Sequence, residues 1–239
     1  MPHQNAESDS EYYSRTLTQF SPPCWTNHKK DQTHSDYFRM LWDMEWVERD
    51  KDELIAAADD KVTLGGNEPH SVKQSSTTPE SFYNAVVYWK EHIKRPLAVP
   101  GILWGPSGKS WWEEYQKFSP PKPDAYHIHI YAYDGPHWTH QFYEALNTFG
   151  DRPLIISEAG GWGVVPDVQK EIMSDIYTVI ALNRCPSVFW FSSKYGPYAP
   201  YWCATDCQTR SEHVTQVGVG YKKYANKESY MVSLPVIMG

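Results

Sequence analysis

Glu68 stands at a corner where a short apolar segment ends. The preceding Val-Thr-Leu tripeptide is typical of a buried strand, and Gly65 and Gly66 allow the backbone to bend after it. Pro69 prevents the strand from continuing. A carboxylate at such a corner, with the amide of Asn67 beside it, is placed to face a cavity. In isolation, the same residues would more often form a surface turn.

A second glutamate, Glu158, strengthens the functional interpretation. It follows Pro-Leu-Ile-Ile-Ser, another strand-like segment, and is itself followed by Ala159 and two glycines. The carboxyl ends of parallel strands converge on one face of a barrel, where active sites lie. We therefore predict that Glu68 and Glu158, although far apart in sequence, face the same cavity.

Two carboxyl groups across one cavity can cleave a glycosidic bond. One protonates the leaving oxygen, and the other attacks the anomeric carbon or activates water. In the retaining arrangement the two groups lie about 5–5.5 Å apart. As the acid, Glu68 would need a raised pKa, and we expect partial burial to raise it.

Strand-like and helical segments alternate along the chain, and this pattern predicts a parallel sheet. Thr78 and Pro79 are expected to begin one of the helices as N-cap and first residue. The predicted strands are 15–20, 24–25, 37–42, 62–64, 97–104, 124–131, 154–157 and 188–192. The predicted helices are 50–59, 78–93, 109–118, 137–149, 166–182 and 212–225.

The fold prediction is α/β, a (β/α)8 TIM barrel with abbreviated first βα units. The strand at 62–64 is counted as the fourth, and only 61 residues precede it. Residues 1–11 are polar and acidic, which predicts a flexible N-terminal tail. No repeat or linker divides the remainder, so 12–239 is expected to form a single glycosidase-like domain.

Strand alternation predicts the surroundings of the glutamates. In the segment 124–131, one face carries Ala125, His127, His129 and Tyr131 and is expected to line the barrel mouth. The other face, with Tyr126, Ile128 and Ile130, is expected to contact the helices.

Tryptophans at strand ends are candidates for stacking on sugar rings. Trp42 ends the third predicted strand, Trp104 the fifth, and Trp190 lies on the eighth. The chain contains 11 Trp and 17 Tyr, more than a core of this size needs. We expect about half of these aromatic residues to be core residues.

Several segments resemble glycoside hydrolase family 128, a clan A family of (β/α)8 enzymes that cleave β-1,3-glucans. The segment 64–69 (Leu-Gly-Gly-Asn-Glu-Pro), with Gln74 and Ser75 after it, resembles the acid/base segment. Residues 40–42 (Met-Leu-Trp) and 129–131 (His-Ile-Tyr) resemble the third-strand and sixth-strand motifs. Residues 156–158 (Ile-Ser-Glu) resemble the nucleophile segment. The resemblance extends from about residue 40 to residue 190.

The resemblance implies a retaining endo-β-1,3-glucanase with Glu68 as general acid/base and Glu158 as nucleophile. Asn67 would bind the sugar 2-hydroxyl, and Tyr131 or His129 would orient Glu158. The implied partner is a β-glucan polysaccharide or oligosaccharide, and neither a cofactor nor a metal is expected. One departure from the family pattern, His70 in place of the usual Asp, bears on the shape of the sugar subsites.

The composition argues against two other classes of binding partner, nucleic acids and membranes. The net charge of −7 argues against nucleic acid, and no apolar run is long enough to span a bilayer. We expect a monomer. The resemblance favours secretion, although the N-terminus lacks a signal-peptide pattern. The four cysteines are too few for a disulfide scaffold, and Cys203 and Cys207 could form a local bridge.

Alternative functions remain open at the level of sequence. The barrel could bind glycans without cleaving them, or it could cleave mannan or xylan. His127 and His129 could be metal ligands, but such sites need further His and Asp ligands at other strand ends. The segment before Gly108 and Lys109 lacks the spacing of a phosphate-binding loop, because Leu103 stands where that motif requires Gly.

Overall fold

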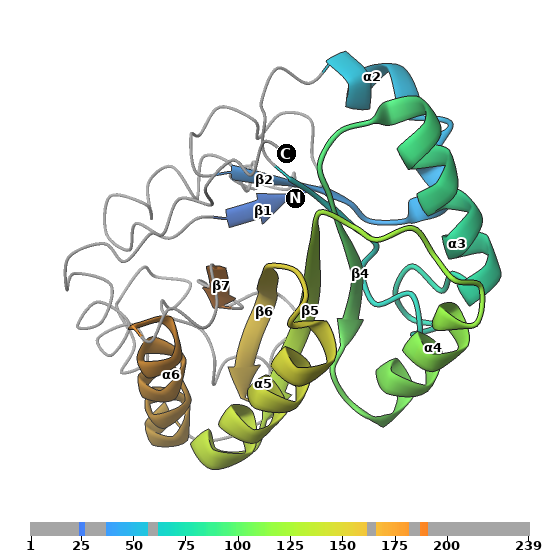
Figure 1. The fold of residues 1–239 in the computed structure, drawn as a ribbon. Coiled ribbons are helices and arrows are strands. Elements are labelled where there is room, and N and C mark those ends of the chain that lie inside the picture. Colours follow the sequence, from blue (N-terminus) through green and yellow to red (C-terminus); the bar gives the residue numbers. More distant parts are fainter. Residues whose placement is uncertain (1–23, 27–36, 57–61, 162–165, 182–186, 191–239) are drawn as a thin grey trace, which may run out of the picture.

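The computed structural model describes residues 24–26, 37–56, 62–161, 166–181 and 187–190 (Figure 1). Four predictions lie outside the described residues: the tail at 1–11, the strand at 15–20, the helix at 212–225 and the bridge between Cys203 and Cys207.

A curved parallel sheet forms the centre of the molecule, and each strand pairs with the next one along the chain. The strands are β1 (Cys24–Thr26), β2 (Tyr37–Leu41), β3 (Thr63–Gly65), β4 (Leu97–Leu103), β5 (Ala125–Ala132), β6 (Leu154–Gly161) and β7 (Ser187–Trp190). The predicted α/β class and parallel sheet are confirmed. Among the described residues, the strand counted as fourth in the sequence is β3.

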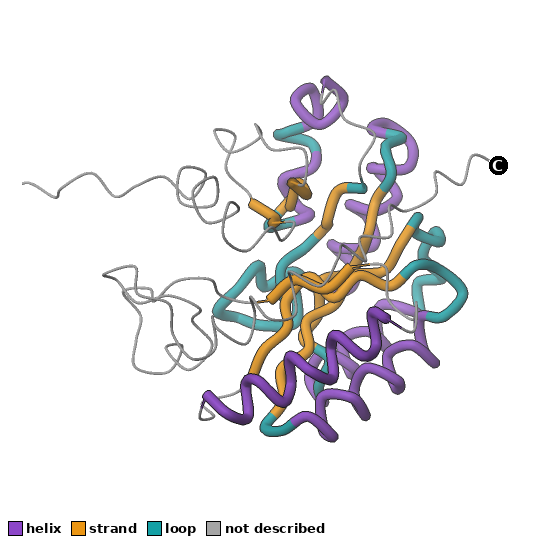
Figure 2. Tube along the Cα trace, turned by 90° about the vertical axis from the view of Figure 1, so that its left-hand side faces the viewer, coloured by secondary structure: helices purple, strands orange, loops and turns teal. Residues whose placement is uncertain are grey.

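Helices lie on the outside of this sheet (Figures 1 and 2). They are α2 (Lys51–Ala56), α3 (Pro79–Tyr88), α4 (Pro106–Gln116), α5 (Gly135–Phe149) and α6 (Pro166–Ala181), with a 3₁₀ turn η2 (Met44–Val47) and a π turn η3 (Trp89–Ile93). Thr78 caps α3 as predicted, since its side chain accepts a hydrogen bond from the Ser81 N–H. Within the described part of the chain, no helix has the length and apolar character needed to cross a membrane.

The start of α4 and the end of β6 differ from the predicted boundaries. Helix α4 begins at Pro106 rather than near residue 109, because proline is well suited to the first turn of a helix. Strand β6 continues past Ser157 to Gly161, so Glu158 lies within the strand and not after its end.

The sheet separates two apolar clusters, and β5 contributes to both. Tyr126, Ile128 and Ile130 pack with the aromatic residues of α3, α4 and α5 on the helix side. Ala125 packs inside the curve of the sheet with Leu64 and its neighbours on β2, β4 and β6. The predicted alternation along β5 is therefore confirmed. Burial of each large side chain stabilises the fold by about 1.5–3 kcal/mol.

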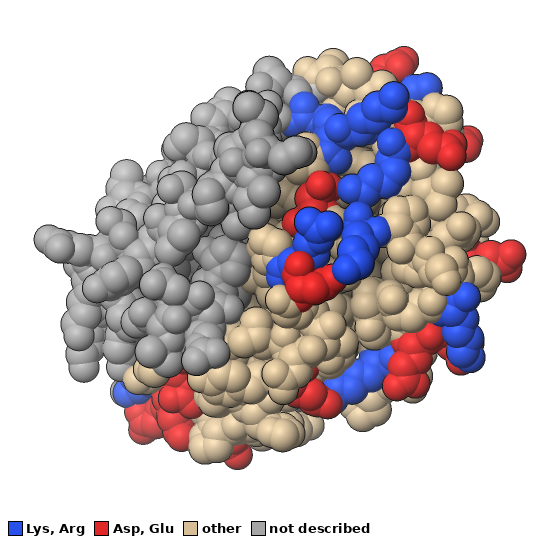
Figure 3. Space-filling model, viewed as in Figure 1, with Lys and Arg blue, Asp and Glu red and all other residues tan. Residues whose placement is uncertain are grey.

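Charge is unevenly distributed over the described surface. In the view of Figure 3, many Lys and Arg side chains gather in a band that also contains acidic side chains, and further groups of both charges lie along the lower and right-hand edges. The net charge of −7 therefore does not make this face uniformly acidic.

Candidate active site

Glu68 is held in a loop by glycines that permit an unusually close approach. Gly66 and Glu68 both have positive φ angles, +85° and +47°. The Glu68 N–H donates a 2.9 Å hydrogen bond to the Gly101 carbonyl on β4. A Cβ atom on Gly101, whose φ is +70°, would lie 2.1 Å from the Gly66 oxygen. The corner therefore depends on glycine at both positions, and it fixes the Glu68 backbone to the neighbouring strand.

Glu158 comes close to Glu68 through a β-bulge. Between β5 and β6, Ile128 pairs with Ile156 and His129 pairs with Glu158, so Ser157 is an extra residue. Ile156 packs on the helix side and Ser157 faces inward, so strict alternation would turn Glu158 toward the helices. The bulge instead keeps Glu158 on the inner side, beside His129. Bulges next to active sites commonly redirect a side chain in this way.

The structure brings both glutamates to one histidine. His129 Nδ1 lies 3.0 Å from Glu68 Oε1 and 3.5 Å from Glu158 Oε2. The Tyr131 hydroxyl donates a 2.8 Å hydrogen bond to Glu158 Oε2. One oxygen of each glutamate and a nitrogen of His129 all lie within 4.8 Å of one another. This separation is close to the spacing of about 5–5.5 Å that retaining glycosidases use.

The two carboxyl groups have opposite pKa shifts. Burial would raise the pKa of Glu68, but the hydrogen bond with His129 and the positive charges of His129 and His70 lower it overall. Burial, together with the negative charge of Glu68, raises the pKa of Glu158 and outweighs the lowering effect of His129 and Tyr131. The shift for Glu68 is opposite to the predicted one, because the histidine charges exceed the effect of burial.

His129 is the positive partner of this pair. Burial would lower its pKa, but the charges of Glu158 and Glu68 raise it overall. Its side chain is fully buried, whereas the side chains of Glu68 and Glu158 are 15% and 10% exposed. The cluster therefore favours an imidazolium ion between two carboxyl groups that open toward solvent or a ligand.

Asn67 lies beside Glu68 with one end of its amide available. Its backbone N–H donates to the Trp42 carbonyl, and its Nδ2 donates to Gln74 Oε1 over 3.1 Å. Asn67 Oδ1 is buried and has no hydrogen-bond partner among the described residues. This oxygen can accept a hydrogen bond from a sugar hydroxyl. Trp42, half-buried at the end of β2, is anchored next to it.

The other two tryptophans are placed differently. Trp104 is only 4% exposed and packs edge-on against Phe149 in the helix-side cluster. This position does not fit the predicted contact with sugar, because the indole is enclosed by core residues. The backbone of Trp190 pairs with Ala159, next to Glu158, and its side chain lies outside the described structure.

A buried layer beneath the carboxylates ties three strands together. His127 Nε2 contacts the Gly65 carbonyl at 3.0 Å, and its Nδ1 contacts Ser157 Oγ at 2.9 Å. Burial lowers the pKa of His127 to about 3, so the ring is neutral. Since a carbonyl can only accept, Nε2 carries the proton and Nδ1 accepts from Ser157. His127 is thus the hydrogen-bonded inner residue, and both its nitrogens are engaged away from Glu68 and Glu158.

Sequence patterns did not assign a role to Ser157, His70 or Gln74. The Ser157 bulge has no compositional signature. His70 has a buried Nδ1 without a partner among the described residues; burial lowers the pKa of its imidazole, and its positive form lowers the pKa of Glu68. Gln74 was noticed only as part of a family segment, and the structure shows it orienting Asn67.

The same three residues are the described ones whose donor atoms are close enough to hold a metal ion: Glu68, His129 and Glu158. Hydrogen bonds also hold Glu68 to His129 Nδ1 and Glu158 to Tyr131, whereas His129 Nε2 is buried and has no hydrogen-bond partner among the described residues. Of the two histidines considered as metal ligands, only His129 belongs to this group.

Comparison with known proteins identifies a matching family. A family model described as "Glycosyl hydrolase catalytic core" matches residues 23–199. A search of curated proteins finds no match.

Solved structures with a similar fold include several family 128 enzymes. One is a subgroup I endo-β-1,3-glucanase from Amycolatopsis mediterranei, solved as a Glu-to-Ala variant in complex with laminaritriose and laminaribiose. It has 16% sequence identity to this chain and a TM-score of 0.71, and the match covers 92% of this chain and 96% of that one. A subgroup VI exo-β-1,3-glucanase from Aureobasidium namibiae has 13% identity, a TM-score of 0.66, and coverage of 78% and 77%. A subgroup II endo-β-1,3-glucanase from Sorangium cellulosum has 19% identity, a TM-score of 0.61, and coverage of 79% and 80%. The fold resemblance to family 128 is confirmed.

Proposed function

Because the chain belongs to the glycosyl hydrolase catalytic core family, we propose that it is a retaining glycoside hydrolase that cleaves β-glucan, specifically an endo-β-1,3-glucanase. The observation that carries this proposal is the pair of carboxyl groups whose oxygens lie within 4.8 Å of each other and of His129. The complete (β/α)8 barrel is part of the proposal.

The reaction proceeds in two displacements. Glu158 attacks the anomeric carbon while Glu68 gives its proton to the departing glycosidic oxygen, which leaves a glycosyl ester on Glu158. Glu68, now ionised, takes a proton from water. The resulting hydroxide equivalent displaces Glu158 and restores both groups. Tyr131 stabilises Glu158 as the ionised leaving group through its 2.8 Å hydrogen bond.

The reactive protonation state requires a proton transfer in the free site. The pKa of Glu68 is lowered and that of Glu158 is raised, so Glu158 keeps a proton to higher pH than Glu68 does. In the reactive form, Glu68 is protonated and Glu158 is ionised. Substrate binding covers the exposed edge of Glu68 and favours its neutral form, because desolvation disfavours the carboxylate. His129 Nδ1, which reaches both carboxyl groups, provides the route for the proton.

The choice of β-1,3-glucan is supported by the solved neighbours, which are described as β-1,3-glucanases. The endo assignment is supported by the subgroup I and subgroup II enzymes among them. Asn67 Oδ1 would accept a hydrogen bond from a sugar hydroxyl, and Trp42 and Trp190 would flank the sugar ring. Mannan and xylan are the alternative substrates for the same two carboxylates.

Hydrolysis of laminarin by Glu68→Gln and Glu158→Gln variants tests the assignment. We expect release of reducing sugar to fall about 10²–10⁴-fold for Glu68→Gln, the usual contribution of a general acid. For Glu158→Gln the expected loss is about 10⁴-fold or more, since the nucleophile is absent. Glu114→Gln on the exposed face of α4 is the matched control and should retain full activity.

The outcomes separate the competing functions. Undiminished activity in either active-site variant would remove the assignment. Binding of laminarin without turnover by the unaltered protein would favour a glycan-binding barrel. Higher activity on mannan or xylan would change the substrate, and loss of activity with a chelator, restored by zinc, would indicate a metal-dependent enzyme.

A further inference from the structure

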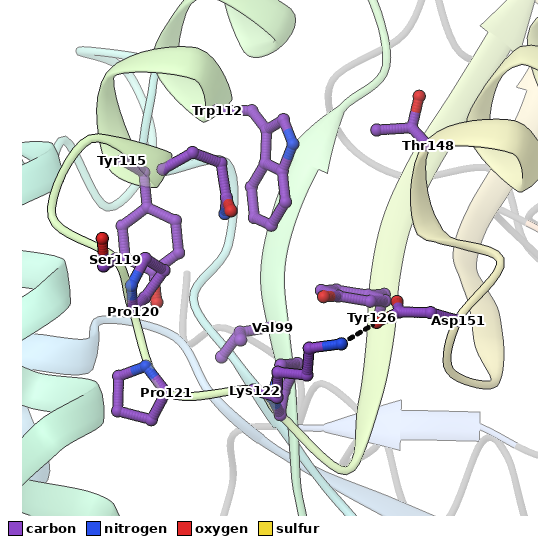
Figure 4. A pocket seen from close by; sticks show the side chains of 12 residues that line it. Val99, Trp112, Tyr115, Ser119, Pro120, Pro121, Lys122, Tyr126, Thr148 and Asp151 are labelled. Atoms are coloured by element: carbon purple, nitrogen blue, oxygen red, sulfur yellow. Dashed lines mark hydrogen bonds and ion pairs between the residues drawn. The ribbon is translucent and has the colours of Figure 1, made fainter.

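A pocket away from Glu68 and Glu158 lies near the amino ends of β4 and β5. Figure 4 shows the side chains that line it. It has a volume of about 440 Å³ and lies between α4, the segment 119–123 and the end of α5. Val99 and Tyr126 reach it from near the amino ends of β4 and β5, whereas Glu68 follows the carboxyl end of β3. A ligand in this pocket would therefore not compete with a ligand at the catalytic residues.

Aromatic side chains from the core form the rear wall of this pocket. The ring centroid of Trp112 lies 5.6 Å from that of Tyr115, 5.8 Å from that of Tyr126 and 5.0 Å from that of Phe149. Figure 4 shows Trp112 and Tyr115 extending from α4 into the pocket. These mutual contacts hold the rings in place before any ligand binds.

One polar group in the wall has no partner. Tyr115 is 1% exposed and lines the pocket, and its hydroxyl has no hydrogen-bond partner among the described residues. A buried hydroxyl without a partner costs about 1–3 kcal/mol. A ligand hydroxyl in the pocket would recover this free energy.

The rim of the pocket supplies further polar groups. Lys122 Nζ and Asp151 Oδ2 form a 2.6 Å ion pair, drawn as the dashed line in Figure 4. Gln116 and Thr148 are exposed and also line the pocket. The pocket thus combines a flat aromatic surface with an amide, a carboxylate, an ammonium group and hydroxyls.

We propose that this pocket is a secondary, non-catalytic binding site for a glucosyl unit of the β-glucan. The pyranose ring has an apolar C–H face that suits Trp112, and a rim of hydroxyls that suits Tyr115, Gln116 and the ion pair. The identity of the sugar rests on the proposed function. A polymer with many identical units can occupy both sites, which raises the effective concentration of glucan at the catalytic site.

The depth of the pocket favours a single ring over an extended peptide. Proline-rich peptides bind exposed aromatic grooves along several residues. Here Tyr115 and Tyr126 are both buried, and the volume of about 440 Å³ suits one compact group. A terminal glucosyl unit, or one glucosyl ring of a chain, has this shape.

Retention on insoluble β-1,3-glucan (curdlan) tests the site, with the Glu158→Gln variant used so that the polymer stays intact. Tyr115→Phe removes only the unpartnered hydroxyl, and the double variant Gln116→Ala with Asp151→Ala removes exposed rim groups. We expect each to weaken binding about three- to tenfold, in line with one or two neutral hydrogen bonds. The double variant Glu114→Ala with Lys117→Ala removes an exposed ion pair on α4 outside the pocket and should bind normally.

A second measurement separates this proposal from the proposed function. In the otherwise unaltered enzyme, the pocket variants should hydrolyse laminaripentaose normally and degrade curdlan more slowly. Retention on curdlan equal to that of the control, with the fold intact by circular dichroism, would overturn the secondary site. Failure of the unaltered enzyme to hydrolyse laminaripentaose would overturn the proposed function instead.

Discussion

The corner that carries Glu68 and the bulge that carries Glu158 deliver similar side chains by different means. Glu68 lies in a loop, at a positive φ angle that few non-glycine residues adopt. Glu158 lies inside a strand, and one extra residue, Ser157, turns it inward. Each device departs from regular structure at the point where a carboxylate is needed.

The same difference appears in the electrostatics. Glu68 lies beside His129, and the hydrogen bond and charge of His129 lower the pKa of Glu68 despite partial burial. The Glu158 strand is buried, and the loss of water raises the pKa of Glu158. Chemically identical groups are thereby distinguished by their surroundings, which is the usual basis for separate roles of two carboxylates.

Removal of Glu158 should have the largest effect and should reveal which face of the sugar it attacks. Glu158→Ala is expected to lower hydrolysis of an activated aryl β-laminaribioside by about 10⁴-fold or more. Added azide can enter the vacated space and attack the anomeric carbon directly. The product should be the α-glycosyl azide, identified by NMR. Formation of the β-azide would mean that Glu158 is the acid/base and that the two roles are exchanged.

Removal of Glu68 should produce an effect that depends on the leaving group. Glu68→Ala is expected to slow hydrolysis of laminarin by about 10²–10⁴-fold, because the sugar oxygen needs a proton to depart. An aryl laminaribioside with a good leaving group needs little protonation, so its first displacement should be nearly normal. Azide should then yield the β-glycosyl azide from the ester on Glu158. Equal losses on both substrates would contradict the acid role.

Regular patterns in the sequence were sufficient to predict most elements that position the site. The apolar runs predicted the strands, Thr78 and Pro79 predicted the start of α3, and alternation along β5 placed His127, His129 and Tyr131 inward. These predictions succeed because each depends on local geometry with a fixed period.

Predictions failed where tertiary contacts decided the outcome. The pKa of Glu68 depends on His129 from another strand and on His70, so burial alone gave the wrong direction. Trp104 is at a strand end, but its ring packs on Phe149 of a helix. The bulge at Ser157 depends on the register between two strands, which no single segment encodes.

The close approach of Gly101 to Gly66, which positions the Glu68 loop, can be disrupted by a substitution that leaves both carboxyl groups in place. Gly101→Ala is expected to lower the free energy of unfolding by about 2–4 kcal/mol, because its Cβ meets the Gly66 oxygen at a strained φ angle. Gly105→Ala is the matched control, since nothing lies within 4 Å of its Cβ, and it should change stability by less than about 1 kcal/mol. Urea denaturation measures both. Equal stability of the two variants would mean that the corner tolerates a side chain.

The smallest effect should come from loss of the Tyr131 hydroxyl, which donates a hydrogen bond to Glu158. Tyr131→Phe removes the hydrogen bond to Glu158 and should lower kcat/KM by about tenfold, the value of one charge-assisted bond. Tyr133→Phe, at an exposed position, is the control.

The pH profile of Tyr131→Phe reports the order in which the two carboxyl groups ionise. The hydrogen bond favours the charged form of Glu158, so its loss raises the pKa of Glu158 further. With the pKa of Glu68 lowered and that of Glu158 raised, Glu158 is the second to ionise as pH rises. The basic limb of kcat/KM, which reports the free enzyme, should therefore move to higher pH while the acidic limb stays in place. Movement of the acidic limb would show that Glu158 ionises first, and no movement of either limb would remove Tyr131 from the control of Glu158.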